Sequence, residues 1–157
     1  MKKLICLAAA LLMAVSFAAC QPGGEEAKSP VVADVAAKLA AEIKFPEMAS
    51  QEAASLQYYG FDEIDTSNIE ELSYQIASSG LTPEEVLIIK MKDDSQIADI
   101  KTMMETRRDK IAATAADYTP ELVNQLDTAV IGTSGVYAYM AITPDNKKAR
   151  EIIDEMF

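Results

Sequence analysis

The side chains that could carry chemistry in this chain are carboxylates, hydroxyls, lysines and arginines. The sequence contains no histidine, which removes the usual general base and the commonest metal ligand. Its two cysteines, Cys6 and Cys20, both lie in the first twenty residues. If those residues form a leader that ends at a modified Cys20, the folded part has no thiol for a disulfide or a zinc site. The sequence places no two carboxylates in a common cleft, so we predict that the protein is not an enzyme.

The densest cluster of oxygen ligands is the acidic segment 61–70. It contains Asp62, Asp65 and Asn68, but it has no glycine and lacks the alternate spacing of a calcium loop. Side chains of this kind commonly cap turns. We therefore predict neither a metal site nor a cofactor.

Four tyrosines are candidates for contact with a ligand. Tyr58 and Tyr59 stand beside Gly60 and could form an aromatic wall, although such rings more often pack at a helix end. Tyr137 and Tyr139 alternate along a predicted strand, so both rings face the same side. If helices cover only the other side, these two rings line an open surface; the alternative is that the N-terminal helices cover them.

Arg108 is the remaining candidate for a ligand contact. On a helical wheel it falls between Met104 and Ala115, within the apolar stripe of the longest predicted helix. A charge in that position needs a partner or a route to water. A neighbouring carboxylate and a bound anion are the two alternatives.

The elements that must position these residues follow from hydrophobic spacing and from start and stop signals. The stripe in residues 30–44 recurs at helical intervals, and Ser29 and Pro30 are typical of a helix start. Period-two alternation over 69–76 and a β-branched run over 86–92 indicate strands. Helices are predicted over 30–44, 50–59, 94–116, 120–126 and 143–157, and strands over 69–76, 86–92, 129–133 and 136–142.

These elements predict an α+β fold. From residue 69 the order is strand, strand, helix, strand, strand, helix, which gives a four-stranded antiparallel sheet with helices on one face. One or two N-terminal helices precede it. The predicted organisation is a leader over 1–19, a modified cysteine and tether over 20–29, and a single domain over 30–157.

The leader resembles the signal peptide of a bacterial lipoprotein. A basic start at Lys2 and Lys3 precedes an uncharged apolar run, and small residues then lead to Cys20. Phe17 stands where such signals usually have leucine. The resemblance implies that Cys20 receives acyl chains such as palmitate and anchors the protein to the outer face of the cell membrane. Ordinary secretion, with cleavage near Ala18, is the alternative.

The chain is strongly acidic, with a net charge of −11. That charge opposes binding to nucleic acid or to an anionic membrane surface. The lipid is therefore the predicted link to the membrane, and nucleic acid is not a predicted partner.

Four segments resemble one known family. They are Tyr58–Asp62, Glu84–Lys92, Asp117–Glu121 and Val136–Tyr137 before a C-terminal helix. Together they are similar to family 4358 of the domains of unknown function, found in lipoproteins of Gram-positive bacteria. The resemblance covers about residues 45–157 and implies an α+β domain that faces the envelope, without implying an activity.

The sequence thus predicts a lipid-anchored extracytoplasmic domain that binds a protein, a peptide or a small ligand in the envelope. A carboxylate-dependent hydrolase of envelope polymer is one alternative. An accessory subunit of a membrane complex is another.

Overall fold

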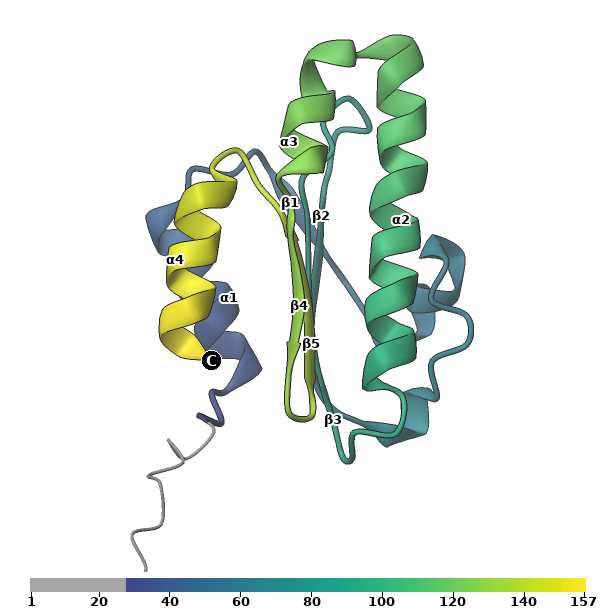
Figure 1. Ribbon diagram of the computed structural model, residues 1–157, viewed down its shortest axis with the longest axis vertical. Helices are drawn as coiled ribbons and strands as arrows, with labels where there is room; N and C mark the ends of the chain where they lie inside the picture. Colours follow the sequence, from purple (N-terminus) through teal and green to yellow (C-terminus); the bar gives the residue numbers. More distant parts are fainter. Residues whose placement is uncertain (1–27) are drawn as a thin grey trace, which may run out of the picture.

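The computed structural model describes residues 28–157, so the predicted leader and Cys20 lie outside the described residues. The described chain runs from an N-terminal helix through a sheet to a C-terminal helix (Figure 1). Its elements in order are α1 (Val32–Glu42), β1 (Met48–Gln51), the 3₁₀ helices η1 (Ala53–Tyr59) and η2 (Thr66–Asn68), β2 (Ile69–Ala77), β3 (Glu85–Met91), α2 (Ile97–Tyr118), the 3₁₀ helix η3 (Pro120–Leu122), α3 (Val123–Asp127), β4 (Val130–Ser134), β5 (Tyr137–Ile142) and α4 (Asn146–Met156).

The strands form one antiparallel sheet in the order β1-β2-β3-β5-β4. The α+β class and the antiparallel pairing are confirmed, but the prediction of four strands is wrong. The fifth strand, β1, pairs with β2 through Met48–Ala77 and Gln51–Tyr74. Residues 50–59 were predicted as a helix, and the structure has the end of β1 followed by η1 there. Four residues without alternation carry too little local signal to indicate an edge strand.

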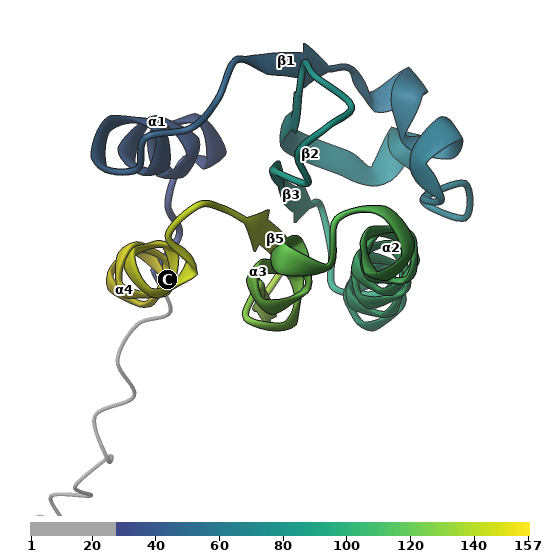
Figure 2. The same ribbon diagram turned by 90° about the horizontal axis from the view of Figure 1, so that it is seen from above.

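Helices cover both faces of the sheet, so the prediction of helices on one face is wrong. Figure 2 shows α1 and α4 together on one side and α2 with α3 on the other. Because side chains alternate along each strand, the sheet supplies two separate cores. Leu87, Ile89 and Met140 pack towards α2, whereas Val86 and Ile88 pack towards α1 and α4.

The apolar stripe of α1 packs against the sheet, with Val35 and Leu39 buried. The helix begins at Val32, two residues later than predicted, and Ser29 does not cap it. The backbone N–H of Val32 instead donates to Glu71 Oε2 at 2.8 Å. A carboxylate at this position satisfies a free N–H group and complements the helix dipole. Glu71 also pairs with Lys90 at 3.3 Å, which ties α1 to β2 and β3.

The helix α2 is 22 residues long and extends past the end of the sheet (Figure 1). The chain then returns through η3 and α3, and Leu126 of α3 is fully buried in the core on the α2 side. The turn of residues 78–84, between β2 and β3, rises at the same end of the molecule. A cleft lies at this end of the fold, between the turn and α2.

Candidate functional site

A cleft of about 540 Å³ lies between the second half of α2, η3 and the turn after β2. We call it the α2 cleft. Its lining is mostly apolar, with two basic residues and several hydroxyl groups. The lining residues are Gly80, Leu81, Thr82, Pro83, Arg107, Lys110, Ile111, Thr114, Ala115, Tyr118, Thr119 and Leu122. A second hollow of about 230 Å³ lies beside η1 and includes Asp62.

Arg107 reaches from the cleft into the core beneath it. Its Nε donates to Glu85 Oε1 and Oε2 at 3.2 and 3.1 Å, and its Nη2 donates to Oε2 at 2.9 Å. The Glu85 side chain is only 1% exposed, whereas that of Arg107 is 23% exposed. Glu85 Oε1 also accepts a hydrogen bond from the Tyr74 hydroxyl at 2.8 Å. The buried carboxylate therefore fixes the guanidinium of a residue that also lines the cleft.

Two tyrosines complete the surroundings of this ion pair. The Arg107 guanidinium lies 5.4 Å from the centre of the Tyr59 ring, within the range of a cation–π contact. Tyr59 packs edge-on against Tyr74, with ring centres 5.4 Å apart. Burial and then the negative charge of Glu85 raise the pKa of Tyr74 well above its ordinary value. The phenol consequently keeps its proton and remains a hydrogen-bond donor to Glu85.

Lys110 is the second basic residue of the α2 cleft, one turn further along α2. It forms no salt bridge with any of residues 28–157. Its Nζ lies 3.9 Å from the point that a Cβ on Gly60 would occupy, which places the ammonium group where η1 ends. The lining contains no acidic residue, and Lys110, an exposed side chain, is its basic residue without an ion pair among residues 28–157.

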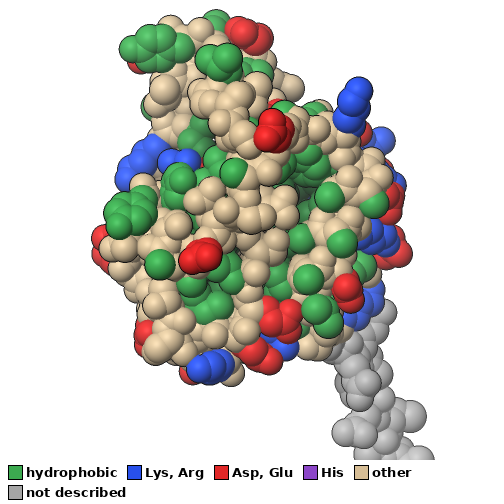
Figure 3. All heavy atoms as spheres, turned by 180° about the vertical axis from the view of Figure 1, so that it is seen from behind, with side chains coloured by type: hydrophobic (Ala, Val, Ile, Leu, Met, Phe, Trp, Pro, Cys, Tyr) green, Lys and Arg blue, Asp and Glu red, His purple; other side chains and the backbone are tan. Residues whose placement is uncertain are grey.

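The apolar part of the cleft includes the two most exposed large hydrophobic residues of the described chain. Leu81 is 80% exposed on the turn and Tyr118 is 82% exposed at the end of α2. Ile111, Ala115 and Leu122 belong to the same lining. Figure 3, which views the molecule from behind, shows hydrophobic and basic side chains close together in the upper part of the surface. The cleft thus combines an apolar wall with a charged floor at Arg107 and with an exposed lysine, Lys110.

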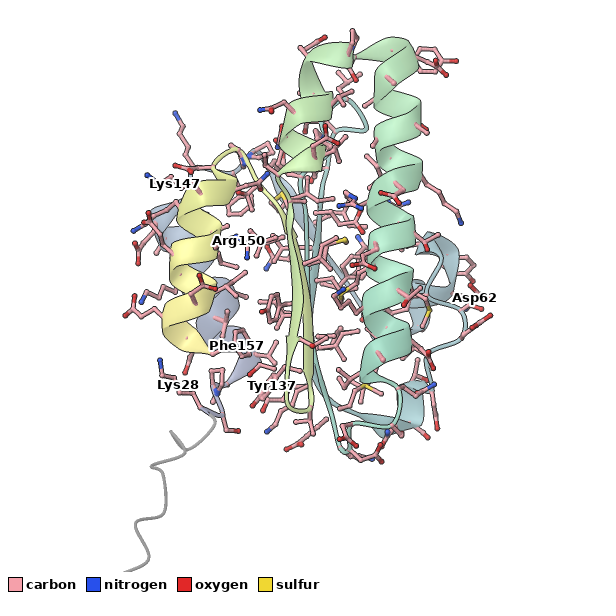
Figure 4. All side chains as sticks on the ribbon, in the orientation of Figure 1. Lys28, Asp62, Tyr137, Lys147, Arg150 and Phe157 are labelled. Carbon is pink, nitrogen blue, oxygen red and sulfur yellow. The ribbon has the colours of Figure 1, made fainter. Side chains whose placement is uncertain are left out.

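Tyr137 and Tyr139 do not form an open surface. Tyr137 is 3% exposed, and its ring packs edge-on against Phe157, with centres 5.1 Å apart. Tyr139 stacks on the same Phe157 ring at 5.1 Å. Figure 4 shows Tyr137 and Phe157 between α4 and the sheet. The layer formed by α1 and α4 covers this face, whereas the alternative from the sequence named the N-terminal helices and not the C-terminal one.

Arg108 and Tyr58 lie outside the α2 cleft. Arg108 pairs with the adjacent Asp109 at 2.7 Å, and the Asp109 side chain is 66% exposed. Tyr58 is 79% exposed on η1, whereas its neighbour Tyr59 is the residue that contacts Arg107. Of the candidates from the sequence, only Tyr59 borders the charged floor of the cleft.

Cys20 lies outside the described residues, so its predicted lipidation remains a prediction. In the acidic segment, Asp65 accepts hydrogen bonds from Ser67 N and Oγ at 3.0 and 2.7 Å. These bonds lower the pKa of Asp65, as expected for a carboxylate that caps a turn. Among residues 28–157, no cluster of three or more acidic side chains is placed to hold a metal ion. None of the helices there combines the length and the apolar composition that crossing a membrane requires.

Sequence reasoning missed Arg107, Lys110 and the buried Glu85. Glu85 begins a run of apolar residues, and a charged residue at a strand end normally indicates exposure to solvent. A second buried carboxylate, Glu84, accepts a hydrogen bond from Gln125 Nε2 at 3.0 Å. Nothing in the local pattern links either glutamate to a partner that is more than twenty positions away.

Comparison with known proteins gives one match. A family model described as a domain of unknown function, DUF4358, matches residues 41–143. Comparisons with curated proteins and with solved structures find no match. The matched segment contains every strand of the sheet, the whole of α2 and therefore the complete α2 cleft. On this match the chain belongs to the DUF4358 family.

Proposed function

We propose that the protein is a lipid-anchored domain of the cell envelope that binds a small ligand in the α2 cleft. The observation that carries this proposal is the cleft itself. Its volume of about 540 Å³ lies in the range of about 300–1,000 Å³ typical of ligand sites. A mostly apolar lining with a few convergent polar groups is also typical of such sites.

The composition of the cleft supports binding rather than hydrolysis. Its lining residues are apolar, hydroxyl-bearing or basic. Neither of the two buried carboxylates nearby lines the cleft: Glu85 pairs with Arg107, and Glu84 accepts from Gln125 through Oε1, while its Oε2 has no hydrogen-bond partner among residues 28–157. A hydrolase that used two carboxylates would need both of them to face its substrate.

The proposed location rests on the leader. A basic start, an uncharged apolar run and a small-residue exit before Cys20 support lipidation at that cysteine. Acyl chains on Cys20 would hold the domain at the outer face of the membrane, where its ligand would be a molecule of the envelope.

Blocking the cleft tests the binding proposal. Thr114 lines the cleft and is exposed, so Thr114→Trp should fill the cleft without disturbing the core. Ala113→Trp, at the next exposed position but outside the lining, is the matched control. A fragment library is screened by amide NMR shifts against residues 28–157. We expect hits that shift the cleft residues and that weaken about tenfold or more in Thr114→Trp, but not in Ala113→Trp. The proposal fails if no fragment binds the cleft, or if the fragments bind Thr114→Trp as tightly as they bind Ala113→Trp.

Membrane fractionation tests the location. In the native host we expect the intact chain in the membrane fraction and Cys20→Ala outside it. Lipid-bearing Cys20 as the first residue should appear in the mass spectrum of the purified protein. A Cys20→Ala variant that stays with the membrane would contradict the proposed anchor.

A further inference from the structure

We propose that the ligand of the α2 cleft is a small amphiphile with an anionic head and an acyl-like tail. The head would bind at Arg107 and Lys110, and the tail would lie along the apolar wall towards Tyr118. This inference names the ligand class of the site and rests on the proposed function, because it requires the cleft to be a binding site.

Arg107 has N–H donors that Glu85 does not use and that could bind such a head group. A guanidinium carries five N–H groups on three nitrogens. Nε and Nη2 donate to Glu85. For Nη1, the part of the chain that the structure describes supplies no hydrogen-bond partner. Because Arg107 also lines the cleft, an anion there would complete the hydrogen bonding of the guanidinium.

Glu85 makes Arg107 a fixed anchor. The buried carboxylate holds the guanidinium through three contacts of 2.9–3.2 Å, and Tyr74 holds the carboxylate. Arginine normally loses side-chain entropy when it binds an anion, and a guanidinium that is already held in place loses less. A buried ion pair is weak evidence for stability, so its role in presenting Arg107 gives it a functional explanation.

The charges favour an anion over a neutral or cationic head. Glu85 neutralises Arg107, whereas Lys110, an exposed residue of the lining, has no salt bridge with residues 28–157. The chain as a whole carries a net charge of −11. The lining contains Arg107 and Lys110 but no acidic residue, so the charges that face the cleft complement an anionic head.

The apolar wall fits an extended tail. Arg107 and Tyr118 are eleven positions apart on α2, which corresponds to about 16 Å along the helix axis. Ile111 and Ala115 lie on the wall between them. Leu81 and Tyr118, both about four-fifths exposed, would be covered by a tail that leaves the cleft between the turn and the helix end. Burying this apolar surface favours binding by about 25 cal/mol per Å².

Titration with matched amphiphiles tests the head group. Decanoate, decyl phosphate, decanol and decyltrimethylammonium are titrated below their micellar concentrations, with amide NMR as the readout. We expect both anions to shift residues around Tyr118 and Leu81, and to bind about tenfold tighter than decanol. Decyltrimethylammonium should bind with the lowest affinity of the four. The preference between decanoate and decyl phosphate distinguishes a fatty-acid head from a phosphate head, and both outcomes support the inference.

Variants that remove a positive charge from α2 provide a second test of the head group. Lys110→Gln should weaken decanoate binding about threefold and leave decanol unchanged. Lys101→Gln, on the same helix but paired with Glu105, should change neither. Equal binding of decanol and decanoate in the cleft would overturn the head-group inference and leave the proposed function standing. Failure of every amphiphile and every fragment to reach the cleft would overturn both.

Discussion

Two adjacent arginines on α2 have different roles. Arg107 pairs with a carboxylate that is 1% exposed, whereas Arg108 pairs with one that is 66% exposed. The apolar stripe alone favours Arg108 as the inward-facing residue. Which arginine turns inward depends on Glu85, which β3 places opposite α2 and which is 22 positions away in the sequence.

Replacing each arginine in turn tests this difference. Arg107→Gln leaves Glu85 buried without its cation, and we expect a loss of about 3 kcal/mol in the free energy of unfolding. Arg108→Gln removes a pair whose carboxylate is exposed and should change that free energy by less than about 0.5 kcal/mol. Chemical denaturation of both variants provides the measurement. Equal losses would show that the buried pair is not the one that stabilises the fold.

Tyr74 makes the fold sensitive to high pH. Its pKa is raised in the folded state, mainly by burial and also by the charge of Glu85. A tyrosine in the unfolded chain has a pKa of about 10. The contribution of Tyr74 to the free energy of unfolding is therefore fully present below about pH 10. Above that pH the unfolded state releases the proton that the folded state retains. Stability should then fall by up to about 1.4 kcal/mol per pH unit.

Denaturation between neutral pH and pH 11 measures this slope. Tyr74→Phe, although less stable at neutral pH because Glu85 loses a donor, should lose stability less steeply above pH 10. Tyr58→Phe, at an exposed ring, is the matched control and should follow the wild type. If the stability of all three proteins falls with the same slope above pH 10, Tyr74 is not the group that makes the fold sensitive to high pH.

At the scale of elements, the start of α4 depends on a side-chain network. Thr143 and Pro144 were predicted to begin this helix, but it begins at Asn146, and Asp145 caps it by accepting from Lys148 N at 2.9 Å. Asn146 is 8% exposed. Its Oδ1 accepts from Thr143 N at 2.8 Å, and its Nδ2 donates to Gln125 O at 2.6 Å. One amide therefore joins α4 to the end of α3.

Removing that amide should loosen both helices. Asn146→Ala leaves the buried N–H of Thr143 without its acceptor, and we expect a loss of about 2–3 kcal/mol in the free energy of unfolding. Asn124→Ala, at an exposed position in α3, is the control and should be nearly neutral. Hydrogen exchange should show faster opening of the first turn of α4 in Asn146→Ala alone. Unchanged exchange in that turn would contradict the proposed junction.

The sequence predicted well those elements whose signal is local. Alternation located β2 and β5, and an apolar run located β3; these strands and the one predicted over 129–133, which is β4, lie within a few residues of their observed bounds. The strand β1 was missed because Met48–Gln51 has no alternation and owes its conformation to pairing with β2. The α2 cleft was missed for a similar reason. Its two walls, the turn after β2 and the end of α2, come together only in the folded chain.

At the scale of the whole molecule, the fold has three layers, and the family match does not include all of them. The matched residues 41–143 end before α4 and begin near the end of α1. These two helices cover the face that carries Val86, Ile88 and Ala141, none of which is more than 5% exposed. A chain limited to the matched residues would leave that face in water.

Truncation tests the need for the outer layer. We expect residues 28–157 to be monomeric with a cooperative thermal transition, and residues 41–143 to aggregate or to lose that transition. Size-exclusion chromatography and calorimetry distinguish the two outcomes. A monomeric 41–143 with an unchanged Tm would show that α1 and α4 are dispensable.

The described chain begins beside its own C-terminus. Lys28 Nζ donates to the carbonyl oxygen of Glu155 at 2.7 Å, and the Tyr137 hydroxyl donates to the carbonyl oxygen of Pro30 at 2.9 Å. Figure 4 shows Lys28 and Phe157 at the lower end of the molecule, whereas the end of α2 lies at the opposite end. If Cys20 carries the anchor, the tether joins the domain beside Lys28, at the end of the molecule away from the α2 cleft. A ligand then reaches the cleft without passing the point of attachment.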